Sequence, residues 1–315
     1  MGSRNTVPWA ATSVPEIRRQ WSSALDSVIA QHSEGLKPQS GPSAGTRRMA
    51  RMQEGLAAAI NSMTAENEAL RSAKLFWVSR NMTEAVVSAA ETLPEWTPAV
   101  AAPSPTGLLC WARPAGTCDF AEGRGTSTEV TWDALFWFTR PDGVMQLTPS
   151  SRLTKNPELL SPFNVTSPLW GATTILLNPR APRTEEATGS REAQQFVSIL
   201  GSAWLLMGQT NFAETRTVPG QTAERRPSGS SEPRPSQMVT LIDINRPPPA
   251  KHGGEHRDRS TDVSHDHRWW VGGHWRQQPC GPKNSERRPK WIESHVKGPE
   301  GAPFKKREKV HVLRH

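Results

Sequence analysis

The sequence contains no tyrosine and has only three cysteines among its 315 residues. Cys110, Cys118 and Cys280 are too few for a disulfide framework in a chain of this length, and they suit a reducing compartment. Arginine far outnumbers lysine, a preference that is typical of GC-rich genes. The absence of tyrosine follows from the same codon bias and therefore excludes no function.

Long hydrophobic runs are also absent. The longest, from Phe196 to Met207, is interrupted by Ser198, Gly201 and Ser202, whereas a membrane-spanning helix needs about 20 apolar residues. The N-terminal residues lack the apolar stretch of a secretory signal peptide. We therefore predict a cytoplasmic protein without a membrane partner.

Excess charge is missing from most of the chain. The formal net charge is +8 at pH 7, but the first 245 residues contain equal numbers of basic and acidic side chains. From Arg246 to His315, basic residues outnumber acidic residues two to one. A basic C-terminal segment that also contains tryptophans favours binding to a partner that carries phosphate groups.

The pattern of apolar residues predicts an α+β fold with four regions. The 28 prolines and 23 glycines favour generous loops between them. The regions are a helical region at 1–105, a mixed α+β body at 106–212, a flexible linker at 213–264 with a docked strand at 239–244, and a small basic antiparallel β unit at 265–315.

The helical region is predicted from apolar residues that recur every three or four positions. Ser13 and Glu16 fit a capping box at the start of its first helix. Because the register is not a sustained heptad, packing within the chain is favoured, and self-association through residues 47–93 is the alternative. The periodic residues are Ile17, Trp21, Leu25, Val28, Met49, Met52, Leu56, Ile60, Met63, Leu75, Val78, Met82, Val86 and Leu93.

The body is predicted as short strands followed by a buried helix from Ser190 to about Gly208. Asp133 falls within a strand, and Asp142 falls in the turn of a hairpin. The isolated apolar strand at 239–244 is expected to dock on a sheet edge. The other predicted strands are 108–111, 131–138, 144–147 and 173–177.

The basic β unit shows the two-residue alternation of β-strands. Trp269, Val271 and Trp275 share one parity and basic residues share the other, so we expect an aromatic inner face and a basic outer face. Gly272 and Gly273 mark a bulge or a close approach. The candidate strands are 267–278, 290–297 and 308–313.

Three segments of this unit form a recognisable signature. They are HDHRWWVGGHWRQQ at 265–278, RRPKWI at 287–292 and VKGPEGAP at 296–303. They resemble the pattern HRWxVxGHWRxQxxG, RRPxWI and VKGPxGxP of an uncharacterised family from high-GC Gram-positive bacteria, which includes proteins of plasmids and other integrated elements. The resemblance is looser from Trp132 to Arg216, and Gly272 stands where the family often has arginine. It implies a bacterial accessory protein of such an element, without an established activity.

The basic β unit is the candidate functional site. Its cationic residues can neutralise phosphates and its tryptophans can stack on unpaired bases, which predicts a nucleic-acid interface. A solvated surface over a small tryptophan core is the alternative. The residues predicted for the interface are Arg268, Trp270, His274, Arg276, Arg287, Arg288, Lys290, Trp291 and Lys297.

Metal binding and catalysis find little support in the sequence. His265, His267, His274 and Cys280 have the chemistry of zinc ligands, but their spacing matches no standard zinc module. We therefore predict no metal or other cofactor. The chain also lacks a nucleophile elbow, a P-loop and a dinucleotide-binding fingerprint.

The sequence therefore predicts a non-catalytic bacterial accessory protein that binds nucleic acid through its basic C-terminal unit. The alternative is a protein-interaction module, in which the helices of residues 47–93 mediate assembly and the basic unit docks on an acidic partner. A steep salt dependence of binding to nucleic acid distinguishes the two, because neutralised phosphates release counterions.

Overall fold

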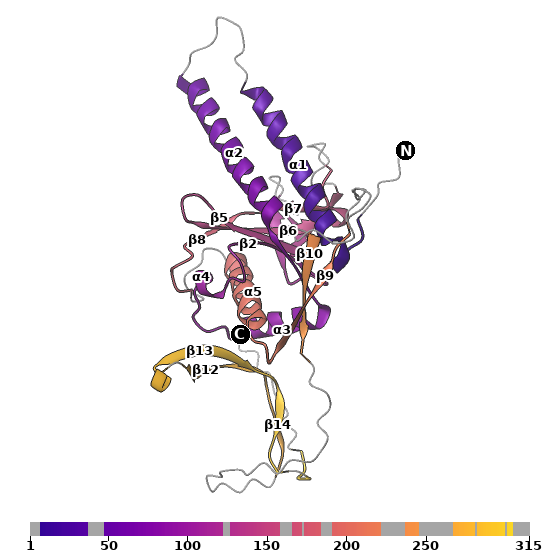
Figure 1. Ribbon diagram of the computed structural model, residues 1–315, viewed down its shortest axis with the longest axis vertical. Helices are drawn as coiled ribbons and strands as arrows, with labels where there is room; N and C mark the ends of the chain where they lie inside the picture. The colour runs from indigo at the N-terminus through magenta and orange to yellow at the C-terminus, as the bar shows by residue number, and fades with distance from the viewer. Residues whose placement is uncertain are drawn as a thin grey trace, which may run out of the picture. The chain divides into compact units, whose positions relative to one another are not determined.

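The computed structural model describes residues 7–36, 47–121, 127–157, 166–171, 173–183, 191–221, 237–245, 267–280, 282–299 and 301–304. The chain divides into two compact units (Figure 1). One comprises Met1–Glu91 and Glu95–Asn245, and the other comprises Thr92–Pro94 and Arg246–His315. The elements confirm the predicted α+β class, with N-terminal helices, a central mixed sheet and small C-terminal β pairs.

The first unit is built on an eight-stranded mixed sheet. Its helices are α1 (Val14–Gly35), α2 (Arg47–Ser72), α3 (Arg80–Ala90), α4 (Pro98–Ala101) and α5 (Arg191–Met207), with 3-10 turns at Ala11–Ser13 and Leu153–Lys155. Its strands are β1 (Lys74–Val78), β2 (Thr106–Trp111), β3 (Thr117–Ala121), β4 (Ser127–Thr131), β5 (Ala134–Thr139), β6 (Met145–Arg152), β7 (Leu169–Gly171), β8 (Ile175–Leu177), β9 (Ala213–Pro219) and β10 (Met238–Ile244).

The strands of the sheet follow the order β7-β6-β5-β2-β1-β10-β9, and β8 also pairs with β6. β1 lies between β2 and β10 and runs parallel to both. The remaining described pairings in the sheet are antiparallel. β3 and β4 form a separate hairpin that the sequence did not predict.

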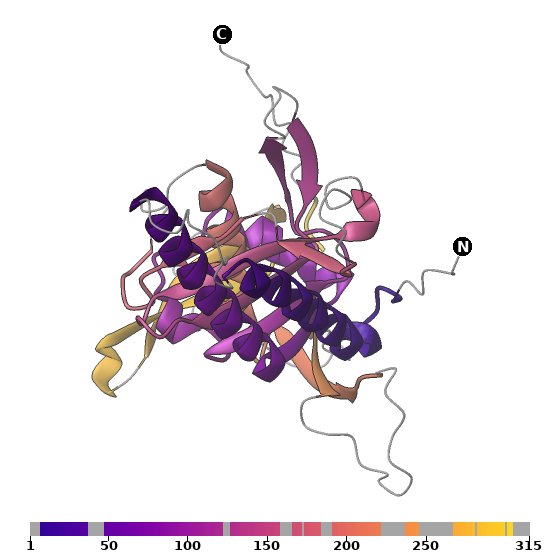
Figure 2. The ribbon, with the colours of Figure 1, turned by 90° about the horizontal axis from the view of Figure 1, so that it is seen from above.

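One face of the sheet is covered by α1 and α2, which lie in front of it in the view from above (Figure 2). Val14, Ile17 and Trp21 of α1 join Leu70 of α2 in the core on this face. Trp21 contacts Phe136 of β5 edge-on, with ring centroids 5.8 Å apart. The four-residue spacing from Ile17 to Trp21 therefore marks a core-facing helix, as predicted.

The opposite face packs against α3 and α5 (Figure 1). Trp137 of β5 stacks on Phe76 of β1 at 5.6 Å and contacts Trp204 of α5 at 5.2 Å between ring centroids. Ser202 Oγ of α5 donates a hydrogen bond of 2.9 Å to the carbonyl of Val86 in α3. These contacts confirm the predicted buried helix, although Ser190 lies outside the described residues.

The helical prediction for residues 75–78 is wrong, because these residues form β1. Ser79 ends the strand and caps α3, accepting a hydrogen bond of 3.2 Å from the Met82 amide. The spacing of Leu75, Val78 and Met82 imitated a helix because a strand buried on both faces has apolar residues at every position. The capping box is also wrong: Ser13 is the last residue of a 3-10 turn and makes no side-chain capping bond.

Two predictions for strands in the body also need correction. The continuous strand at 131–138 is broken, because β4 ends at Thr131 and β5 begins at Ala134, with Asp133 in the link between them. The strand at 239–244 is confirmed as β10, but it lies between β1 and β9 instead of at the edge. The edge belongs to β9, at the beginning of the segment predicted as a linker.

In its described residues, the second unit forms two short antiparallel strand pairs. Residues 267–278 do not form one strand, because the strand is interrupted at Gly272 and Gly273. The segment 290–297 is likewise divided, and the predicted strand at 308–313 lies outside the described residues. The strands are β11 (Trp269–Val271), which pairs with β14 (His295–Lys297), and β12 (His274–Cys280), which pairs with β13 (Glu286–Ile292).

Candidate functional site

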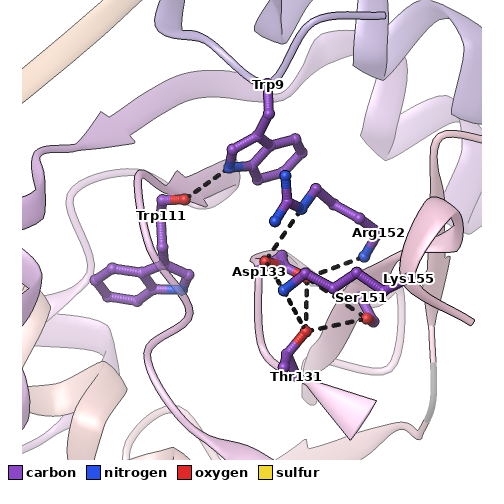
Figure 3. Close-up of polar contacts among 7 residues, drawn as sticks. All are labelled: Trp9, Trp111, Thr131, Asp133, Ser151, Arg152 and Lys155. Atoms are coloured by element: carbon purple, nitrogen blue, oxygen red, sulfur yellow. Dashed lines mark hydrogen bonds and ion pairs between the residues drawn. The ribbon is translucent and has the colours of Figure 1, made fainter. Parts of the chain in front are cut away.

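A buried charge network lies where the β4–β5 link meets the end of β6 (Figure 3). Asp133 is 0% exposed, and its Oδ1 lies 2.8 Å from Lys155 Nζ and 3.3 Å from Arg152 Nε. Its Oδ2 accepts hydrogen bonds from Thr131 Oγ1 at 2.8 Å and from the Arg152 amide at 3.1 Å. Both carboxylate oxygens are therefore occupied by protein donors.

The same network holds the N-terminal segment on the body of the unit (Figure 3). The Arg152 guanidinium lies 5.1 Å from the centroid of the Trp9 ring, a cation–π contact. Trp9 Nε1 donates a hydrogen bond of 2.9 Å to the carbonyl of Trp111. Because Asp133 has no oxygen left for a substrate, the arrangement anchors the fold and does not support general base catalysis.

The sequence did not predict this network. Asp133 falls within the strand predicted at 131–138, and the residues that neutralise its carboxylate, Arg152 and Lys155, are distant in sequence. The available signal was an acidic residue within the apolar run from Val130 to Phe138, because a buried carboxylate needs a cationic partner. That signal does not identify the partner.

In the second unit, the pairing of β12 with β13 places four predicted interface residues on one face. Arg276 lies directly opposite Lys290, and Gln278 lies opposite Arg288. Directly opposite residues and residues two apart share a face of an antiparallel pair. Arg276, Arg288 and Lys290 therefore form a cationic face, and His274 lies on the same side, opposite Ile292.

The register also places Glu286 on this face, opposite Cys280, so cationic residues outnumber acidic ones there by three to one. Arg276, Arg288 and Lys290 make no ion pair with any described residue, and Arg276 and Arg288 are exposed. Like charges directly opposite one another destabilise a β pair. The hairpin thus keeps an electrostatic cost that an anionic partner would relieve.

Trp291 lies on the other face of the hairpin and supports it from behind. It is 7% exposed, and its ring meets Trp275 edge-on at 5.4 Å between centroids. A Cβ on Gly273 would lie 2.6 Å from Trp291 Cζ2, so the predicted close approach at this glycine is confirmed. Arg287 lies on the Trp291 side, opposite Pro279.

The other predicted interface residues lie outside this hairpin. Arg268 Nε donates a hydrogen bond of 2.8 Å to the carbonyl of Ala302, and its guanidinium lies 5.7 Å from the centroid of the Phe304 ring. Trp270 and Lys297 belong to the pair of β11 with β14. The structure therefore separates the nine predicted residues among two strand pairs and a segment that precedes them.

Neither a metal site nor a membrane-spanning helix is found in the described parts of the chain. No group of three or more His, Cys, Asp or Glu side chains there could hold a metal ion, and His265 lies outside those parts. None of the helices described is both long enough and apolar enough to cross a bilayer.

The comparison with known families identifies the relatives of this chain. Residues 78–294 match the AcrVA2-like family, described as the Anti-CRISPR type V subtype A2 family. The chain belongs to this anti-CRISPR family. The matched segment runs from the last residue of β1 through β13 and includes the cationic face. None of the curated proteins compared matches the chain.

Membership in the AcrVA2-like family supplies the biological role that the signature of the C-terminal unit did not. That signature had indicated an accessory protein of a mobile element, with no activity attached. The family places the chain among proteins directed against type V CRISPR systems. The coarse prediction of an accessory protein is confirmed in this form, and binding of nucleic acid stays a prediction.

Proposed function

We propose that this protein is a non-catalytic inhibitor that binds the protein effector of a type V CRISPR system, Cas12a, through the cationic face of its C-terminal unit. The family match supports Cas12a as the target. The matched residues include β12 and β13, the two strands that form the cationic face. The occupied carboxylate of Asp133 and the lack of a catalytic motif support inhibition by binding instead of by chemistry.

The observation that carries the proposal is the unpaired cross-strand couple Arg276 and Lys290, with Arg288 beside it. Such a couple costs stability in the free protein and gains it when an acidic surface approaches. Trp275 and Trp291 hold the two strands together from the other side, so the three charges are presented by a regular hairpin.

Nucleic acid is the second candidate partner, because the same face could neutralise phosphates. The buried position of Trp291 weakens base stacking at that residue in this conformation. An effector that carries a guide RNA presents both an acidic protein surface and phosphates. The two candidates must therefore be separated by comparing the effector with and without its RNA.

The test measures binding of the full chain to purified Cas12a, free and loaded with guide RNA, and to labelled RNA and DNA alone. The double variant R276E/K290E removes the cationic couple. The matched control R287E/K297E changes the same number of charges in the same unit, at exposed residues outside the cationic face. We expect R276E/K290E to weaken binding to the free effector by about tenfold or more and R287E/K297E to have a smaller effect.

Equal losses in the two variants would overturn the assignment of the cationic face. Binding to RNA or DNA alone that falls steeply between about 50 and 200 mM salt, without binding to the free effector, would establish the second candidate instead. An unchanged thermal midpoint in both variants verifies that the unit remains folded.

A further inference from the structure

The edge strand β9 is exposed on both sides of the sheet. Glu214, Thr215, Arg216 and Thr217 are all exposed, and in the described part of the chain no strand pairs with the outer side of β9. An open edge presents unpaired backbone donors and acceptors, which can add another strand. Its side chains indicate which strand fits.

Pairing with β10 leaves an unbalanced acidic group beside this edge. Glu214 lies directly opposite Asp243, and Arg216 lies opposite Leu241, all on one face of the sheet. These four residues line a cleft of about 200 Å³. Asp243 Oδ1 accepts hydrogen bonds from Ser79 Oγ at 2.6 Å and from the Ile244 amide at 2.8 Å, but no described cation pairs with Asp243 or Glu214.

We propose that β9 pairs with β9 of a second copy of this chain, antiparallel and centred on Thr215. In this register Glu214 of each copy lies opposite Arg216 of the other, so the two-fold axis creates two identical ion pairs. Each Arg216 thereby reaches the acidic pair of Glu214 and Asp243 in the other copy, and the site is incomplete without it. The two Thr215 side chains meet on the opposite face, a favourable cross-strand pair.

The charges select this register over its neighbours. A pair centred on Glu214 would place two glutamates opposite each other, and one centred on Arg216 would place two arginines opposite each other. Like charges in directly opposite positions are destabilising. Pro219 at the end of β9 also lacks an amide hydrogen, which discourages registers that extend the pairing through that residue.

The test is sedimentation velocity of the full chain without any effector, so its result does not depend on the proposed inhibitory function. Wild-type protein is expected at twice the monomer mass of 34.8 kDa. R216E and E214R should each weaken the dimer by about tenfold or more, because each replaces two ion pairs with two like-charge pairs. The swapped double variant E214R/R216E should restore it.

A charge reversal at an exposed site in another element controls for net charge. R51E on α2 makes the same change in charge as R216E and should leave the dimer intact. Under oxidation T215C should form a disulfide between copies, whereas T217C, which lies opposite Ala213 in this register, should not. The wild-type protein controls for its own cysteines.

Three outcomes would overturn the proposal. They are a wild-type monomer at all concentrations up to about 100 μM, a dimer that R216E and E214R leave unchanged, and a double variant no better than the single ones. A dimer insensitive to both reversals would direct attention to the helices of residues 47–93.

Discussion

Replacing Asp133 with asparagine tests whether the buried charge network anchors the first unit. The change keeps the shape of the side chain but removes the only carboxylate within reach of Arg152 and Lys155 in the described network. It also turns one acceptor into a donor that faces the Lys155 ammonium or the Thr131 hydroxyl. The expected result is a large loss of stability without loss of the fold class.

The size of the stability loss depends on how deeply Asp133 and its cationic partners are buried. Removing one partner of a buried ion pair costs about 3–5 kcal/mol. Arg152 and Lys155 are 30% and 25% exposed, so water recovers part of their solvation, and we expect a loss of about 2–4 kcal/mol. For a unit of this size, in which 1 kcal/mol shifts the melting temperature by about 2 °C, that corresponds to a fall of about 4–8 °C.

Urea unfolding followed by tryptophan fluorescence is the suitable assay, because urea does not screen charges. The control is Asp142→Asn, since Asp142 is 51% exposed and pairs with Arg140 at 3.3 Å; this change should cost about 0–1 kcal/mol. Combining D133N with K155M should cost less than the sum of the two changes. A loss below about 1 kcal/mol for D133N, or strict additivity, would refute the anchoring role.

Two further predictions concern packing and pH. Gly201→Ala places a Cβ 2.3 Å from Trp96 Cε2 and should lower stability by about 1–3 kcal/mol, whereas Gly55→Ala, in open space on α2, should raise it by about 0.5–1 kcal/mol in the same urea assay. Burial raises the pKa of Glu66 above its ordinary value of 4.5, so its ionised form becomes a growing cost as the pH rises above that value. The variant E66Q keeps an acceptor for Gln146. Its thermal midpoint minus that of the wild type should increase from about pH 4 to about pH 7, and a difference that stays constant with pH would contradict this.

The sequence was most informative where local features, such as helical spacing or turn residues, are enough to determine the structure. The helical spacing of Ile17 and Trp21 predicted the buried face of α1, and the turn around Asp142 predicted the β5–β6 hairpin. It failed where tertiary pairing decides, because β1 became a strand only through neighbours at 106–111 and 238–244. Local periodicity contains no information about such distant partners.

The candidate site shows the same division. Parity predicted that Arg276 would point away from Trp275, and the β12–β13 register confirms that these residues lie on opposite faces. Parity did not predict that Arg268 would be held by the carbonyl of Ala302, because that contact depends on how the chain returns after β14. It also did not predict the pairing of Asp133 with Lys155, which are separated by a complete hairpin.

The limits of the family match have a structural consequence for experiments on this protein. The match begins at Val78, the last residue of β1, and so leaves most of β1 outside it. β1 is the strand that joins β2 to β10, and β10 in turn holds β9. A fragment limited to residues 78–294 would lose most of the strand that connects β10 and β9 to the rest of the sheet, and with it the edge proposed to join two copies. Both proposals therefore require the full chain, in which a dimer would present two cationic faces and raise the apparent affinity for an effector with two acidic patches within reach.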